Sequence, residues 1–341
     1  MTGISIIIPN YNRAELIGFT LQNMLHQTVL PDEIIVIDDG STDNSVEIIK
    51  SFGNRVKLLK QKNQGPGAAR NLGLSVAKGE FIQFMDSDDL MSLNKLELQL
   101  GALKTSGADF AYCSWVRTLI QDQQLSLQSP ILQGKALPDS KSMLEWQLGS
   151  WSIIFQNCLF RRKALDNAGR YLTDMRVAED GEYLVRILYS GAQPVFTNQC
   201  LVFYRTGGND QISASASSNQ RQANDLTKYY ERVGNILSDN LSKMKESTKR
   251  DLVLELYRHN RYCKTNGYGT TDLNNPLQKL VSGYPIIFIK FLVYSNALKK
   301  KLSSAPACVP RSKAMQPRAI NDYDLKLAKE LEALLEKINK L

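Results

Sequence analysis

Short apolar runs alternate with helix-periodic segments through the N-terminal part of the chain. Runs rich in aliphatic and aromatic residues predict buried strands at residues 4–8, 33–38, 56–59 and 81–85. Apolar positions three and four residues apart predict helices at residues 12–27, 41–52 and 65–77. Asn12 is expected to cap the first of them. This alternation is typical of right-handed βαβ units, and it predicts an α/β fold with a Rossmann-like, mostly parallel sheet flanked by helices.

Polar residues follow three of the predicted strands, at 9–11, 38–39 and 86–89. The carboxyl ends of parallel strands lie at one edge of a sheet, which is where open α/β sheets bind ligands. Asp86 and Asp88 can direct oxygen atoms at one divalent cation, and such hard ligands suit Mg²⁺ or Mn²⁺. The acidic cluster alone favours a solvated turn that caps the next helix. The convergence of three clusters favours a nucleotide-type site.

Four segments carry a resemblance to the family-2 glycosyltransferases. In chain order they are Ser5–Asn12 (SIIIPNYN), Ile35–Asp43 (IVIDDGSTD), Asn63–Asn71 (NQGPGAARN) and Phe84–Asp89 (FMDSDD). Their order, their spacing and their residues all match successive blocks of that family. The resemblance implies the GT-A fold, a nucleotide-sugar donor that is usually a UDP-sugar, a divalent cation (Mn²⁺ or Mg²⁺) and inversion at the anomeric carbon.

The resemblance also implies roles for residues that would bind the nucleoside. Pro9 and Tyr11 would line the base pocket, and Asp39 would hydrogen-bond the uracil edge. Arg70 would lie against the base or the diphosphate. Two alternatives stay open, because Tyr11 could simply pack against the end of the sheet and Asp39 could only cap the next helix.

The acidic cluster supplies the rest of the implied donor site. Asp88 would bind the metal directly, and Ser87 would contact the donor. Asp86 would meet the ribose or a metal-bound water, and it is the second candidate metal ligand. Carboxylates in this position fit the chemistry, since a cation that they hold neutralises the negative charge developing on a diphosphate leaving group.

Two later segments match the family less completely. The Glu179-Asp180 pair resembles the block in which an acidic pair opens a helix, and Asp180 would be the general base that deprotonates the acceptor hydroxyl. The pair could alternatively serve only the helix dipole. Many members have a histidine shortly after the arginine of the Tyr204-Arg205 pair, whereas this chain has TGGND at 206–210. The third metal ligand is therefore open, with Asn209 and Asp210 as substitutes.

The middle of the chain is expected to build the acceptor half. Its predicted elements are a helix at 93–105, a strand at 109–119, a hairpin and loop at 121–139 and strands at 157–161 and 193–204. Trp146 and Trp151 could form a platform for a sugar ring, although core tryptophans are equally common.

The sequence predicts four regions. They are a glycosyltransferase domain at 1–217 (donor half 1–100, acceptor half 101–217), a helical region at 218–302, a linker at 303–322 and an amphipathic helix at 323–341. The apolar stretch 284–294 is shorter than the roughly 20 residues of a membrane span. Lysines 299–301 follow it, so segment 284–301 predicts peripheral membrane contact, with a core helix as the alternative. Leucine and isoleucine at heptad spacing over 327–341 could mediate homo-oligomerisation or pack back on the protein.

Composition narrows the picture further. Five scattered cysteines and two histidines among 341 residues argue against a disulfide framework or a zinc site. The N-terminus has no charged region before its first apolar strand, so we expect no secretory leader and a cytoplasmic location, possibly the inner face of the cytoplasmic membrane. The formal net charge of +8 suits an anionic partner. The basic residues gather in the C-terminal part without interleaved aromatic residues, which disfavours nucleic acid as that partner.

These observations lead to one main hypothesis. The chain would transfer a hexosyl or N-acetylhexosaminyl group from a nucleotide-sugar to a glycan or lipid-linked acceptor, in polysaccharide, glycolipid or other glycoconjugate synthesis of the cell envelope. An inactive nucleotide-sugar-binding scaffold or sensor is the alternative from another class, suggested only by the missing histidine. P-loop NTPases, Rossmann dehydrogenases and nucleotidyltransferases fit poorly, because no Gly-rich phosphate loop follows the first strand.

Overall fold

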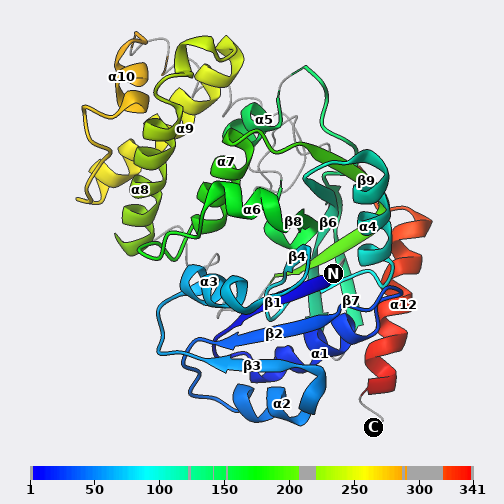
Figure 1. Ribbon diagram of the computed structural model, residues 1–341. Coiled ribbons are helices and arrows are strands. Elements are labelled where there is room, and N and C mark those ends of the chain that lie inside the picture. Colours follow the sequence, from blue (N-terminus) through cyan, green and yellow to red (C-terminus); the bar gives the residue numbers. More distant parts are fainter. Residues whose placement is uncertain are drawn as a thin grey trace.

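A single mixed sheet runs through the molecule in the computed structural model (Figure 1). The structure describes residues 3–121, 124–140, 142–150, 153–206, 220–285, 289 and 318–338. Within these residues, the strand order is β3-β2-β1-β4-β8-β6-β9-β5, with β7 paired to β6. The predicted α/β class is therefore confirmed.

The predicted donor half contains a run of neighbouring parallel strands. Its strands are β1 (Ile4–Asn10), β2 (Glu33–Asp38), β3 (Lys57–Lys60) and β4 (Phe81–Phe84). Its helices are α1 (Ala14–Leu25), α2 (Ser45–Ser51) and α3 (Pro66–Val76). All these strands pair in parallel, as the strand–helix alternation predicts.

The rest of the sheet, which begins with β5 at the end of the predicted donor half and continues through the predicted acceptor half, has mixed pairing. Its strands are β5 (Leu90–Met91), β6 (Phe110–Gln121), β7 (Gln124–Leu132), β8 (Cys158–Arg161) and β9 (Pro194–Arg205). Its helices are α4 (Lys95–Ser106), α5 (Met143–Ser150), α6 (Arg162–Ala168) and α7 (Glu179–Tyr189). β8 is antiparallel to both β4 and β6, whereas β6 and β9 are parallel. The expected hairpin is β6–β7.

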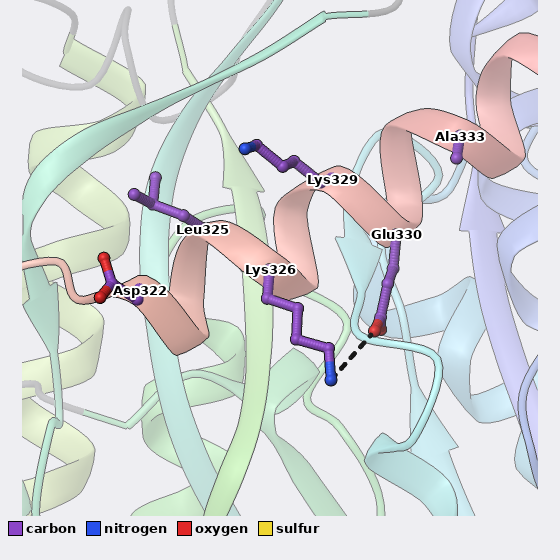
Figure 2. Close-up of a pocket in the computed structure, with 6 residues that line it drawn as sticks. All are labelled: Asp322, Leu325, Lys326, Lys329, Glu330 and Ala333. Carbon is purple, nitrogen blue, oxygen red and sulfur yellow. Dashed lines mark ion pairs between the residues drawn. The ribbon is translucent and has the colours of Figure 1, made fainter.

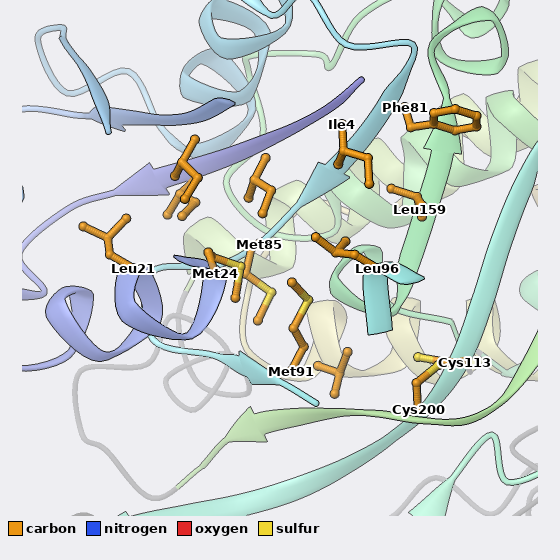
Figure 3. Close-up of a cluster of buried hydrophobic side chains, with 14 of the residues drawn as sticks. Ile4, Leu21, Met24, Phe81, Met85, Met91, Leu96, Cys113, Leu159 and Cys200 are labelled. Atoms are coloured by element: carbon orange, nitrogen blue, oxygen red, sulfur yellow. The ribbon is translucent and has the colours of Figure 1, made fainter. Parts of the chain in front are cut away.

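Alternation along the strands divides the core between two faces of the sheet. Ile4, Ile6 and Ile8 of β1 join a buried cluster with α1, α2 and α4, which Figure 3 shows in close-up. Ile7 points to the opposite face, where α3, α6 and α7 pack. Both faces of β1 are therefore covered, which explains its continuous apolar sequence.

Helices form the rest of the chain that the structure describes. They are α8 (Gln220–Leu237), α9 (Glu246–Thr265), α10 (Pro276–Ser282) and α12 (Asp322–Ile338). The first three pack with α5 and α7 in a third cluster. No helix in the described residues is long and apolar enough to cross a membrane. The predicted membrane-contact segment 284–301 and linker lie largely outside the described residues.

Helix α12 returns to the sheet of the acceptor half. Leu327, Leu331 and Leu334 are buried against residues of β5, β6, β7 and β9. These three leucines thus pack within the chain, as the packing alternative predicts, while the side chains at 338 and 341 lie outside what the structure describes. Figure 2 shows the outer face of α12, which is lined by charged residues and by Leu325.

The structure corrects the predicted helix cap at Asn12 and confirms the predicted core cysteines. Asn12 does not cap α1: its φ is +49°, and its side-chain oxygen accepts a hydrogen bond from Thr42 N at 2.8 Å. Asp43 takes the capping role instead, accepting from Ala14 N at 2.9 Å. The four cysteines among the described residues are free and buried, as expected for core thiols.

Candidate active site

The carboxyl ends of β1, β2 and β4 lie next to one another, because these strands are parallel neighbours. Asn10 ends β1, is buried, and donates to Asp38 Oδ1 at 3.1 Å. The other oxygen of Asp38 accepts from Ser41 N at 3.1 Å. Asp38 therefore fixes the end of β2 and the turn after it. The carboxylate of the adjacent residue, Asp39, faces the loop between β3 and α3.

Asp39 anchors the loop between β3 and α3. Its Oδ1 accepts from Gln61 Nε2 at 2.7 Å and Gln64 N at 2.8 Å, and its Oδ2 accepts from Gly65 N at 2.8 Å. Three hydrogen bonds to a buried carboxylate make a rigid corner at the predicted base pocket. The structure thus gives Asp39 a loop-holding role that the sequence did not predict, and its contact with a base stays a prediction.

The two residues predicted to line the base pocket lie at the end of β1. Pro9 is half-buried and pairs with Ile37 of β2. Tyr11 follows the strand and is 45% exposed. Its ring is therefore not packed into the core, which leaves it accessible to a ligand at this edge.

Arg70 connects the donor and acceptor halves. This buried side chain of α3 donates from Nη2 to Asp86 Oδ1 at 2.8 Å and from Nη1 to Glu179 Oε1 at 2.7 Å. Its guanidinium also lies 5.4 Å from the centre of the Tyr171 ring. Both ends of the guanidinium are thus committed to carboxylates, so Arg70 organises the site in addition to any contact that it makes with the donor.

Asp180 lies at the N-terminus of α7, immediately after Glu179. Burial raises the pKa of Glu179 to about 7 against the attraction of Arg70, and the nearby Asp180 charge adds to the rise. Burial also raises the pKa of Asp180, opposed by Arg70. The Oδ1 of Asp180 accepts from Gly181 N at 2.7 Å. A half-buried carboxylate with a raised pKa is suited to accept a proton near neutral pH.

Asp88 lies between two arginines. Its Oδ2 accepts from Arg13 Nε at 3.2 Å and from Arg205 Nη2 at 2.9 Å, and its side chain is 15% exposed. The sequence had signalled Arg205 only through the Tyr-Arg motif and had not singled out Arg13. Arg13 directly follows the first family-like segment, which was the only available signal.

The two remaining residues of the acidic turn are buried. Ser87 is 6% exposed and Asp89 is 1% exposed. Asp89 accepts from Arg205 N at 2.8 Å, while its Oδ2 has no hydrogen-bond partner among the described residues. Burial, with Asp88 and Asp86 nearby, raises the pKa of Asp89 well above its ordinary value. These features give Asp89 a structural role in joining the turn to β9.

The acidic turn offers two carboxylates as candidate ligands for a cation. Among the described residues, no group of three or more His, Cys, Asp or Glu side chains could hold a metal ion. Magnesium sites in phosphate-transferring enzymes commonly use one or two carboxylates together with substrate phosphates. Asp88 and Asp86, both partly exposed at the same turn, meet that requirement.

Other predicted site residues give a mixed result. Trp146 is 9% exposed and its indole nitrogen donates to Pro138 O at 2.9 Å, so it is a core residue and not a sugar platform. Trp151, Asn209 and Asp210 lie outside the described residues. Gln156, which donates to Asp86, was not predicted, and no sequence signal marked it.

Comparison with known proteins shows the family to which the chain belongs. A sequence profile described as "Glycosyl transferase family 2" matches residues 5–169. Glycosyltransferase GlyG of Streptococcus pneumoniae is 31% identical over 212 residues, which cover 59% of this chain and 70% of GlyG. An uncharacterized glycosyltransferase of Rickettsia bellii is 39% identical, but the match covers 40% of this chain and 20% of that protein.

Solved structures share the fold of the chain. S. aureus TarS in complex with UDP-GlcNAc has a TM-score of 0.60 at 18% identity, covering 98% of this chain and 92% of that chain. Mannosyltransferase PcManGT from Pyrobaculum calidifontis, in complex with GDP-Man and Mn²⁺, has a TM-score of 0.54 at 16% identity, covering 98% and 86%. The chain therefore belongs to glycosyl transferase family 2 and is a glycosyltransferase with the GT-A fold.

Proposed function

We propose that this glycosyltransferase moves a sugar from a UDP-sugar to a hydroxyl group of a glycan or lipid-linked acceptor, with inversion at the anomeric carbon. The observation that carries the proposal is the Arg70 bridge. Because Arg70 pairs with Asp86 and Glu179 at once, the donor edge of the sheet and the N-terminus of α7 meet at one place. A donor bound at the acidic turn would then face the proposed base.

Each proposed role follows from charge and position. Asp180 takes the proton of the acceptor hydroxyl as that oxygen attacks the anomeric carbon and the bond to the diphosphate breaks. Asp88, with Asp86, would hold a Mn²⁺ or Mg²⁺ ion, and the ion when bound would neutralise charge on the diphosphate. Arg13 and Arg205, which flank Asp88, add positive charge for the same leaving group.

The remaining donor contacts are proposed on position alone. Pro9, Tyr11 and Asp39 lie at the ends of β1 and β2, where a uracil base would bind. Ser87 belongs to the acidic turn between Asp86 and Asp88. TarS binds UDP-GlcNAc in its crystal structure, which supports a UDP-sugar as the first donor to test.

The test is a panel of UDP-, GDP- and dTDP-sugars with Mn²⁺ or Mg²⁺, scored for hydrolysis or transfer. We expect turnover of a UDP-sugar that depends on the cation and is lost in Asp88→Ala. Binding of a nucleotide-sugar with neither hydrolysis nor transfer, for every donor and acceptor offered, would instead favour an inactive binding module.

A further inference from the structure

The loop between β3 and α3 is held from two sides. On one side, Asp39 accepts hydrogen bonds from Gln64 N and Gly65 N, both at 2.8 Å. On the other side, Arg176 Nη2 donates to Asn63 Oδ1 at 2.6 Å. A loop of the donor half is thus fixed between the end of β2 and a residue that precedes α7.

Arg176 also packs on the backbone of this loop. Gly65 has a φ of +95°, and a Cβ built there would lie 3.3 Å from Arg176 Cγ. The aliphatic stem of Arg176 therefore lies directly over Gly65, and only a residue without a side chain allows both the backbone conformation and this contact. The guanidinium of Arg176 thus binds Asn63, and its aliphatic stem packs on Gly65 of the same loop.

Helix α8 holds Arg176 in place. Asp225 of α8 is 4% exposed, and its Oδ2 accepts a hydrogen bond from Arg176 N at 2.9 Å. Two residues earlier, Asp174 accepts from Arg232 of the same helix at 2.6 Å and pairs with Lys228 at 3.4 Å. The segment before α7 is therefore tied to the helical C-terminal region, beyond the residues that match the family profile.

We propose that Arg176 is a positioning residue for the donor: held by Asp225 of α8, it fixes the β3–α3 loop, so that the C-terminal helical region sets the affinity for the nucleotide. This inference rests on the proposed function, because the loop must border the nucleotide site. The segment that contains Arg176 leads into α7, which begins at the proposed base. Helix α8 therefore contacts a segment that borders both the proposed donor site and the proposed acceptor site.

The experiment measures UDP binding with Mn²⁺ by calorimetry in a double-mutant cycle. Arg176→Ala and Asn63→Ala should each raise the dissociation constant about fivefold, the size expected for one partly exposed charge-assisted hydrogen bond. The double variant should weaken binding no more than Arg176→Ala alone, since both substitutions remove the same hydrogen bond. Asp225→Ala should match Arg176→Ala, whereas Asp225→Asn keeps an oxygen that accepts from Arg176 N and should bind UDP within about twofold of wild type.

Thr227→Val is the matched control on α8. Thr227 bonds to His259 of α9 at 2.8 Å, and none of its hydrogen bonds among the described residues goes to the segment before α7. Thr227→Val should therefore weaken the contact between α8 and α9, keep the Asp225–Arg176 hydrogen bond and leave UDP affinity unchanged. Unchanged UDP affinity in Arg176→Ala, or effects of Arg176→Ala and Asn63→Ala that multiply, would overturn the proposal.

A second measurement separates this proposal from the proposed function. Deuterium uptake of the β3–α3 loop, without any nucleotide, should be faster in Arg176→Ala and Asp225→Ala than in wild type and Thr227→Val. If wild type bound no UDP, the proposed donor would be wrong and this uptake would still decide on Arg176. Equal uptake in all four proteins would overturn its positioning role.

Discussion

At the scale of single residues, the negative charge of Asp88 is balanced by neighbouring arginines in the absence of a ligand. A desolvated carboxylate is costly without partners, and Arg13 and Arg205 supply two of them. A cation bound together with a diphosphate would bring its own counter-charge, and the two arginines could then pair with phosphate oxygens instead. The arginines and the cation therefore need not compete once the donor is bound.

The titration of Glu179 predicts how the stability of the protein depends on pH. Its pKa of about 7 in the folded protein exceeds the ordinary value of 4.5, so the folded state favours the protonated form. The stability that this provides is complete below pH 4.5 and is lost as pH rises through 7. Glu179→Gln removes the titration, so wild type should lose stability relative to the variant over this range.

Urea unfolding between pH 4 and 8 measures that difference. The free energy of unfolding of wild type, minus that of Glu179→Gln, should fall as pH rises. The exposed Glu15→Gln on α1 serves as the control and should show no such trend. A difference that stayed constant, or that grew with pH, would mean that Arg70 fully compensates the Glu179 charge.

Residue identities in the site could be predicted from the sequence, but their partners could not. The family-like segments pointed to Asp39, Arg70, Asp88 and Asp180, and the structure brings Arg70 together with Asp86 and the pair at 179–180. The Arg70–Glu179 contact joins residues 109 positions apart. Local patterns carry no information on such a pairing, because it depends on how α7 crosses the sheet.

At the scale of elements, the approach of α3 to the sheet depends on Gly73. A Cβ built there would lie 2.4 Å from Ile7 Cγ2 and 2.9 Å from Ile37 Cδ1. Gly73→Ala should therefore lower the free energy of unfolding by about 1–3 kcal/mol, because strain in a packed core outweighs the better helix propensity of alanine.

Gly101→Ala provides the matched control for this substitution. Gly101 lies on the exposed side of α4, with nothing within 4 Å of the added Cβ. Alanine should raise stability there by about 1 kcal/mol through helix propensity alone. Chemical unfolding of both variants distinguishes the two cases, and a stable Gly73→Ala would show that α3 can move away from β1 without cost.

Helix α12 yields a second prediction at this scale. Leu331 is fully buried against the acceptor half of the sheet, and Leu331→Ala should cost about 2–5 kcal/mol. Leu325, on the outer face seen in Figure 2, is 45% exposed, and Leu325→Ala should change stability by no more than about 0.5 kcal/mol.

Chemical unfolding and light scattering check this result together. If α12 served oligomerisation, Leu331→Ala would lower the molar mass in solution at unchanged monomer stability, contrary to the packing that the structure shows. The heptad spacing could not decide this point, since two heptads suit a sheet-packing helix as well as a coiled coil.

Secondary structure was more predictable in the donor half than elsewhere. There, β1, β2 and β4 are covered apolar runs, and a polar or glycine residue precedes each helix, so local signals agree with the fold. The pairing of the acceptor half was not predictable. β8 lies between β4 and β6, antiparallel to both, and its four residues carry no signal of direction.

For the whole molecule, helices on the two sides of the predicted domain boundary near residue 217 share one hydrophobic cluster. Helices α8, α9 and α10 pack on α5 and α7 in one cluster, so the C-terminal helices support the acceptor half directly. The sequence separated these regions because the family resemblance stopped there. Figure 1 shows α8 next to α7, the helix that begins at the proposed base.

The central claim is that Asp180 acts as base beside a donor site organised by Arg70. The most direct test is Asp180→Asn, assayed for UDP binding and for sugar transfer on the same preparation, with the donor that the panel identifies. We predict UDP affinity within about twofold of wild type and transfer reduced by about 10²–10⁴-fold, the usual contribution of a general base. Transfer at the wild-type rate by Asp180→Asn would contradict the account.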